Sequence, residues 1–342
     1  MRVLVDIVHP ADVLFFKRPL DLLRQRGDEV RVLSRHKDVA CQLLDAFGFE
    51  HRPVSTAGVG AVGLASELLG RDWAFVREIA RFRPDVMVGF GGVAIAHAGF
   101  LRRVPSVAFY DSENATLQTR VTWPLIGHLY VPESYRGRVP EGRTTRIPGT
   151  KELSYFHPGA FAPNREIALA NGLDPEGDNF FVRIVQWRAN HDLGKQGWGV
   201  EGLRAVVERL EQNGKVHLSS EIDLPGDLEP RRFRGAITEV HHLIAHCRLT
   251  VGESATMSCE SALLGVPAIY CGRDFPGYIR ELEGESLVAT LDAEQSQQLP
   301  DLIERQLERS QEKARAIRDR YVESRPDWAP KVLEALDRAL SR

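Results

Sequence analysis

The chain has 342 residues, of which 43% are apolar and 27% are charged, and its formal net charge is −3. This length suits two domains of moderate size, and the composition suits a globular protein with a sizeable core. The weakly negative charge argues against a nucleic-acid partner. The sequence has no run of about 18 apolar residues, so no transmembrane segment is predicted. The cysteines are scattered without a C-x-x-C pair, and the first apolar run is too short for a signal peptide. We therefore expect reduced thiols and a cytoplasmic location.

The first half of the chain alternates short β-branched runs with segments of helical periodicity. We expect strands at residues 3–8, 29–33, 85–89 and 106–110, and helices at residues 13–26 and 39–47. A segment rich in proline and glycine, residues 146–178, is interpreted as an interdomain linker with one short helix.

The alternation then resumes. We expect strands at 180–185, 216–219, 249–251 and 268–270, helices at 200–213, 240–246 and 256–264, and a helical tail at 299–340 broken at 325–326. The pattern predicts two facing α/β, Rossmann-like domains with parallel sheets and a cleft between them. We place the domains at residues 1–160 and 161–320, with a last helix at 321–342 returning to the first domain.

Ligands of open parallel sheets bind beyond the carboxyl ends of the strands, so the loops after strands are the candidate site elements. Ser254, Ala255 and Thr256 follow a predicted strand and open a helix, where free N–H groups and the helix dipole attract a phosphate. Glu260 lies one turn further, at a spacing that suits the two hydroxyls of a ribose. The alternative is a capped helix with Ser254 as its N-cap.

The stretch GESATMSCESALLGVPAIYCG, residues 252–272, resembles the strand-to-helix segment of UDP-N-acetylglucosamine 2-epimerases, which recurs in glycosyltransferases of the GT-B fold. Essentially the whole chain, and especially VLVDIVHPADVLFFKRPLDLLRQRGDEVRVLSR, is similar to a family of epimerase-like proteins. The resemblance implies a GT-B-like fold, with Ser254, Ala255 and Thr256 at a diphosphate and Glu260 at the ribose. Two glycines of the epimerase motif are replaced by Ala255 and Thr256.

His9 and Pro10 follow the first predicted strand, where the epimerases have an Arg-Pro pair that reaches the phosphates. Histidine in this place makes a cationic role pH-dependent. Lys17, further along the predicted helix, can point either way. The alternative is that His9 and Asp12 only cap the helix.

Gly91 and Gly92 follow the strand at 85–89 and are not a dinucleotide fingerprint, which needs to follow the first strand. We expect them to allow close approach of a sugar or of the opposing domain. The epimerases carry an acid in this turn, and this sequence does not.

Asp111 and Glu113 follow the next strand, in a stretch that resembles the His-x-Glu-Ala-Gly segment whose glutamate is catalytic in the epimerases. Glu113 is the first candidate for a catalytic acid or base. If Asp111 lies close, the like charges raise one pKa toward the range of a general base. The alternative is an N-capping cluster for a helix beginning near Asn114.

Two more loops belong to the second half. Gln186, Arg188 and Asn190 lie in a stretch that resembles the His-Arg-Arg-Glu-Asn segment of the epimerases, and Arg188 can pair with a diphosphate. The catalytic histidine of that segment is absent. Arg273 and Asp274 match a loop of the epimerases in part, and they either contact the sugar or form an ordinary turn.

Two weaker signals concern a metal and a membrane. His242 and His246 have a spacing compatible with zinc, but no matching ligand pair is evident, and we expect no metal and no cofactor. The apolar stretch at residues 57–70 suggests contact with a lipid carrier, but it has no cationic residue before Arg71, so a packed helix is preferred.

The sequence therefore predicts a metal-independent GT-B glycosyltransferase that uses a UDP-sugar. Arg188 and helix N-termini stabilise the departing diphosphate, and Glu113 or His9 acts as base on an acceptor hydroxyl. The acceptor is unknown, a glycan or lipid-linked sugar being candidates, and peripheral membrane contact is compatible with the latter. The alternatives are a 2-epimerase and a non-catalytic nucleotide-sugar-binding protein.

Overall fold

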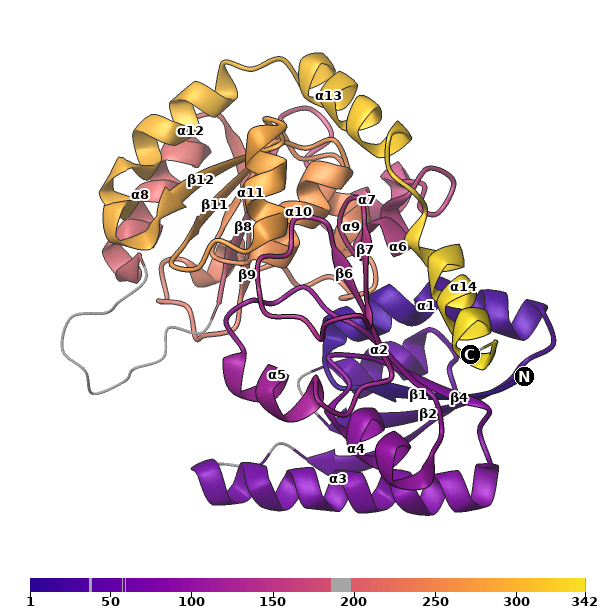
Figure 1. Cartoon of the computed structure of the whole chain (residues 1–342). Helices are drawn as coiled ribbons and strands as arrows, with labels where there is room; N and C mark the ends of the chain where they lie inside the picture. Colours follow the sequence, from indigo (N-terminus) through magenta and orange to yellow (C-terminus); the bar gives the residue numbers. More distant parts are fainter. Residues whose placement is uncertain (37–38, 57, 59, 186–197, 342) are drawn as a thin grey trace. The chain divides into compact units, whose positions relative to one another are not determined.

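The computed structural model describes residues 1–36, 39–56, 58, 60–185 and 198–341 (Figure 1). The chain forms two compact units. Unit 1 consists of Met1–Ala160 and Arg325–Arg342, and unit 2 of Phe161–Ser324. The described residues contain no helix that is long and apolar enough to cross a bilayer.

Unit 1 is built on a parallel sheet of seven strands in the order β3-β2-β1-β4-β5-β6-β7. Its strands are β1 (Arg2–Ile7), β2 (Glu29–His36), β3 (His51–Thr56), β4 (Val86–Phe90), β5 (Ser106–Phe109), β6 (His128–Pro132) and β7 (Thr144–Ile147). The central strands are almost wholly buried because helices cover both faces, which explains their continuous apolar runs. Val3 of β1, for example, pairs with Val30 on one side and Val86 on the other.

Two helical layers cover this sheet. One layer contains α1 (Pro10–Gln25), α2 (Ala40–Ala46), α6 (Leu153–Phe156) and α14 (Trp328–Leu340). The other contains α3 (Gly60–Phe82), α4 (Val93–Arg102) and α5 (Thr116–Thr122), with α3 and α4 running side by side (Figure 1). The chain returns to unit 1 through α14, whose Trp328 is fully buried.

Unit 2 carries a five-stranded parallel sheet in the order β12-β11-β10-β8-β9. Its strands are β8 (Asp178–Ile184), β9 (Gly214–Ser220), β10 (Leu249–Gly252), β11 (Ala268–Gly272) and β12 (Val288–Asp292). Its helices are α7 (Arg165–Ala170), α8 (Gly199–Glu211), η1 (Glu229–Arg231), α9 (Val240–Ile244), α10 (Ala255–Leu263), α11 (Gly277–Gly284), η2 (Ala293–Gln298), α12 (Leu299–Leu307) and α13 (Gln311–Glu323).

In each sheet, successive strands are first added toward one edge and then, from one point on, toward the other edge. In unit 1 this point lies between β1 and β4, and in unit 2 between β8 and β10. The loops that leave neighbouring strands in opposite directions open a crevice at the carboxyl ends, the usual ligand position in such sheets. The loops after β1, β4, β8 and β10 are therefore the positions to inspect.

The parallel α/β organisation predicted from the sequence is confirmed, but the predicted linker is wrong in part. Residues 146–178 contain the end of β7 and the helices α6 and α7, and residues 149–152, directly before α6, are buried. The helical tail is broken twice, before α13 as well as before α14.

Candidate active site

The loop after β1 is fixed by a reciprocal cap on α1. The Asp12 carboxylate accepts N–H bonds from Val8 (2.9 Å) and His9 (2.8 Å), while His9 Nδ1 accepts the N–H of Ala11 (3.2 Å). The capping alternative for His9 and Asp12 is therefore what the structure contains. Since Nδ1 is an acceptor, a neutral His9 carries its proton on Nε2, which makes this exposed side chain a donor. Lys17 packs over the Phe47 ring, 4.4 Å from its centroid.

Burial dominates the electrostatics of Asp12. It raises the pKa of this carboxyl to about 7, against the two N–H bonds that favour the charged form. The charge of Lys151 acts in the same direction as those bonds, and that of Asp6 opposes them. The capping residue of α1 is thus electrostatically linked to a lysine on a distant segment.

The loop after β4 needs its glycines for the backbone. Gly91 and Gly92 have φ of 77° and 63°, the left-handed region that favours glycine. A Cβ on Gly91 would lie 2.4 Å from Nε2 of Gln118, and one on Gly92 would lie 3.0 Å from the side chain of Ile95. These contacts explain both glycines by local packing, and sugar contact at this loop stays a prediction.

A buried charge cluster follows β5. The Lys151 ammonium lies 2.7 Å from Oδ2 of Asp111 and also pairs with the carboxylate of Glu152. All three side chains are buried, and the Phe90 ring centroid lies 5.8 Å from Lys151 Nζ. Ser112 donates to the other oxygen of Asp111 at 3.0 Å. Asp111 therefore faces a cation, and nothing in this geometry makes it a base that is free to take a proton.

Glu113 lies two residues further and is half-buried. Its Oε1 accepts the backbone N–H of Arg136 at 3.1 Å. Burial raises the pKa of Tyr135 to about 12, and the charge of Glu113 adds to that rise, so the two side chains are neighbours. The N-cap residue of α5 is Ala115, not Asp111 or Glu113, and the Ala115 side chain makes no capping hydrogen bond.

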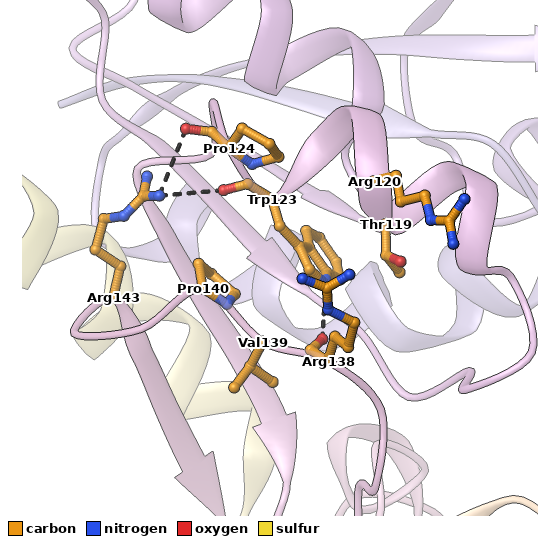
Figure 2. Close-up of a pocket in the computed structure, with 8 residues that line it drawn as sticks. All are labelled: Thr119, Arg120, Trp123, Pro124, Arg138, Val139, Pro140 and Arg143. Carbon is orange, nitrogen blue, oxygen red and sulfur yellow. Dashed lines mark hydrogen bonds between the residues drawn. The ribbon is translucent and has the colours of Figure 1, made fainter.

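A cationic pocket of about 360 Å³ lies on the α5 side of the same unit (Figure 2). Arg120, Arg138 and Arg143 line it together with Trp123, and the residues that line it include no acid. Arg143 donates to the carbonyls of Trp123 (3.2 Å) and Pro124 (3.4 Å), and the Trp123 indole donates to the carbonyl of Arg138 (2.8 Å; Figure 2). The pocket suits an anionic group.

In unit 2, Ser254 caps α10 after β10. Its Oγ accepts the N–H of Met257 at 3.2 Å, so the N-cap alternative is also realised. A helix leaves its first N–H groups without partners inside the helix. Ser254 takes that of Met257, and those of Ala255 and Thr256 have no partner within the helix. The half-buried Ala255 and Thr256 side chains leave room for approach.

Glu260 lies on the same helix and is buried, 3% exposed. Its Oε2 lies 3.1 Å from Nε2 of His241 on α9. Nδ1 of the neighbouring His242 accepts the N–H of Asn164 at 3.0 Å. Within the described part of the chain, no three His, Cys, Asp or Glu side chains stand together in a way that suits a metal ion.

Glu253 connects the residues on either side of the segment 186–197. Its carboxylate accepts the N–H of Val185 (3.2 Å) and the N–H of Trp198 (3.4 Å). Arg188, predicted to bind the diphosphate, and Gln186 and Asn190, predicted as sugar or cleft residues, lie outside the described residues.

The loop after β11 presents Arg273 and Asp274 as exposed side chains. The Tyr270 hydroxyl donates to the carbonyl of Asp274 at 2.7 Å, which holds this turn against the end of the strand. The turn alternative is thus present, and a sugar contact by the two side chains stays a prediction.

Residues 1–176, just over half of the chain, match the model of the family described as "Protein of unknown function (DUF354)". The chain belongs to the DUF354 family. It is also 18% identical to the uncharacterized protein MJ0665 of Methanocaldococcus jannaschii, over 79% of this chain and 82% of that protein.

Solved structures show which fold this DUF354 protein has. The UDP-GlcNAc 2-epimerase of Neisseria meningitidis, solved with UDP-GlcNAc, has a TM-score of 0.67 at 13% identity, covering 99% of this chain and 100% of that one. The spinosyn rhamnosyltransferase SpnG has a TM-score of 0.65 at 15% identity, covering 98% of this chain and 99% of that one. These structures confirm the resemblance to the epimerases and GT-B glycosyltransferases that was expected from the sequence. At identities of 13% and 15%, this likeness shows that the fold is shared.

Several residues of the DUF354 protein's candidate site were missed by sequence reasoning. Lys151 and Glu152 lie in the segment interpreted as a linker, and Glu253 lies inside the stretch at residues 252–272 but directly before Ser254, the first residue assigned a role there. A lysine-acid pair inside a proline-rich stretch gives no signal, because its burial depends on Asp111, 40 positions earlier. Glu253 could have been found from the sequence, because an acid at the end of a buried strand needs hydrogen-bond or ionic partners.

Proposed function

We propose that this protein is an enzyme that binds a nucleotide sugar, and that it transfers the sugar from a UDP-sugar to an acceptor hydroxyl without a metal ion. The observation that carries the proposal is the N-terminus of α10. It follows β10 beside the point where the sheet of unit 2 changes direction, and the N–H groups of Ala255 and Thr256 are not used by the helix. A diphosphate suits such a position.

In this proposal unit 2 binds the donor. The amides of Ala255 and Thr256 receive the diphosphate, and Ser254 keeps the helix start in place by its bond to Met257. Glu260 accepts the ribose hydroxyls, with His241 beside it as the residue that orients the carboxylate. The proposal assigns further contacts with the same donor to Arg188, Gln186 and Asn190. It assigns contacts with the donor's sugar to Arg273 and Asp274.

Unit 1 supplies the base. Glu113 is favoured over Asp111, whose carboxylate is bound to Lys151, and over His9, whose Nδ1 is used in the cap. Glu113 takes the proton of the acceptor hydroxyl while that oxygen forms a bond to the anomeric carbon. The bond from this carbon to the diphosphate oxygen breaks, and its electron pair leaves with UDP. Helix amides stabilise the negative charge that develops on the diphosphate.

The test is turnover of UDP-GlcNAc by the purified chain, with and without a membrane lipid extract or free monosaccharides as acceptors. UDP release and the configuration at the sugar C2 are both followed. The proposal predicts acceptor-dependent UDP release with C2 retained. Glu113→Gln lowers the turnover rate by about 10²- to 10⁴-fold with little change in UDP binding, since glutamine cannot take the proton.

Glu133→Gln is the matched control, because Glu133 is an exposed acid of the same unit. Inversion at C2 without acceptor would instead establish the 2-epimerase, the alternative favoured by the fold shared with the Neisseria meningitidis enzyme. UDP binding without turnover, unaffected by Glu113→Gln, would establish a non-catalytic binding protein.

A further inference from the structure

The helical layer formed by α3, α4 and α5 has an unusual outer face. Of the eleven large hydrophobic side chains exposed in the described residues, eight belong to these three helices. They are Val62, Leu64, Leu69, Trp73, Phe100, Leu101, Leu117 and Val121. Leu69, Trp73 and Phe100 are 70%, 63% and 68% exposed. Single exposed hydrophobics are ordinary, but such a concentration on one layer indicates a binding surface.

The three helices form one continuous layer. Asp72 of α3 lies 2.7 Å from His97 Nδ1 of α4, and Nε2 of the same histidine lies 3.2 Å from the carbonyl of Val121 on α5. Figure 1 shows α3 and α4 lying side by side beneath the sheet of unit 1. The exposed hydrophobics therefore belong to a single helical layer, whose solvent-exposed surface we call the α3–α5 face.

The charge of the α3–α5 face has one sign. The three acids of α3 are bound to other partners: Glu67 to Arg35, Asp72 to His97, and Glu78 to Arg31 and Arg52. Helices α4 and α5 contain no acid. Six arginines of the face or its rim are exposed, namely Arg77, Arg81, Arg83, Arg102, Arg103 and Arg120, and among the described residues none of them has an acidic partner. In a chain of net charge −3, this face is basic.

Two of these arginines occupy positions where glycine is the usual residue. Arg83 and Arg103, at the ends of α3 and α4, have φ of 52° and 56°. Both line an open hollow of about 520 Å³ together with Leu101 and Arg102. The left-handed conformation at a helix end is strained for a residue that has a Cβ. Arginine at these positions therefore costs conformational free energy that glycine would not. The hollow places cationic groups next to exposed Leu101.

We propose that the α3–α5 face docks on the surface of an anionic phospholipid bilayer. Exposed Trp, Phe and Leu side chains next to exposed arginines are typical of proteins that bind such a surface. The apolar side chains enter the headgroup boundary, and the arginines contact lipid phosphates. A symmetric second copy is disfavoured, because it would bring arginines against arginines. Helix α3 extends to Phe82, so the apolar stretch at its start and the arginines after Arg71 belong to one element. Docking does not depend on the proposed chemistry.

The test is co-sedimentation of the full chain with phosphatidylcholine vesicles that contain phosphatidylglycerol, and with vesicles of phosphatidylcholine alone. We expect binding to the anionic vesicles that weakens with salt. Arg102→Gln with Arg103→Gln lowers the partition coefficient by about 30-fold, from the usual contribution of two arginines at such a surface. Trp73→Ser with Phe100→Ser lowers it by at least about tenfold.

The matched control is Arg305→Gln with Arg320→Gln, two exposed arginines of unit 2, which should leave the partition coefficient unchanged. All these side chains are exposed, so circular dichroism should show an unchanged fold. Equal binding to both vesicle types, or equal loss in the control, overturns the proposal. So does a stable dimer in sedimentation velocity that Trp73→Ser with Phe100→Ser dissociates, because the face then belongs to a second copy.

Discussion

The ammonium of Lys151 lies 2.7 Å from the carboxylate of Asp111, and both side chains are buried at the carboxyl edge of the unit 1 sheet. Glu152 also binds this lysine, so one cation balances two buried carboxylates. Lys151 belongs to the segment that follows β7, and Asp111 follows β5. The pair thus ties the last strand of the sheet to the loop that carries Glu113.

Lys151→Met is expected to destabilise the protein by about 3–5 kcal/mol, because it leaves two buried carboxylates without their cation. Denaturant unfolding measures the change. The control is Lys331→Met, since Lys331 forms an exposed pair with Glu334 that contributes less than about 1 kcal/mol. If both variants lose the same small amount, Lys151 does not hold this edge together.

Sequence patterns located most of the strands that are buried on both faces. Those around Val3, Val86 and Val107 are continuous apolar runs, and the structure places strands there within a residue or two. The edge strands β3, β7 and β12 were missed, since HRPVST, TTRI and VATLD are partly exposed. Strand β6, which is buried between β5 and β7, was missed as well. An edge strand is specified by pairing with its neighbour, which local periodicity cannot reveal.

The candidate site was predictable where it depends on local sequence. Ser254 before α10 and His9 before α1 stand at strand-to-helix turns, and a cap uses residues three or four positions apart. Partners that are distant in sequence were not predictable. Lys151 beside Asp111 and His241 beside Glu260 result from the order of the strands and from helix packing.

Asp12→Asn is expected to change how stability depends on pH. The pKa of Asp12 is raised by burial to about 7, so the stability linked to its protonated form is present below pH 4 and lost as pH rises through 7. Both N–H bonds to Asp12 end on the same oxygen, which the amide of asparagine can replace. The variant keeps the cap without the charge.

The difference in unfolding free energy between Asp12→Asn and the wild type should grow from pH 4 to about 7, by an amount on the order of 4 kcal/mol, and then level off. Urea unfolding at a series of pH values measures it. Asp223→Asn serves as control, since the Asp223 side chain is exposed. Parallel stability curves for Asp12→Asn and the wild type would contradict the raised pKa.

Ala255→Glu is expected to weaken UDP binding by at least about tenfold without loss of stability. A carboxylate in the first turn of a helix interacts favourably with the dipole, by about 0.3–1 kcal/mol, but repels a diphosphate at the same amides. Ala255→Gln, of the same size without the charge, separates repulsion from bulk. Titration calorimetry with UDP and thermal unfolding measure the two effects. Unchanged UDP affinity in both variants would remove α10 from the donor site.

Glu253→Gln is expected to expose one of two backbone amides to exchange. The carboxylate of Glu253 uses one oxygen for Val185 and the other for Trp198, at 3.2 and 3.4 Å, and glutamine offers a single acceptor. The loss of one charge-assisted bond should lower stability by about 1 kcal/mol. Hydrogen exchange should become faster at one of the two amides. The control is Glu201→Gln, at an exposed pair with Arg204, which should leave exchange at both amides unchanged. If Glu253→Gln also leaves exchange unchanged at both amides, the Glu253 carboxylate does not hold Val185 and Trp198 in place.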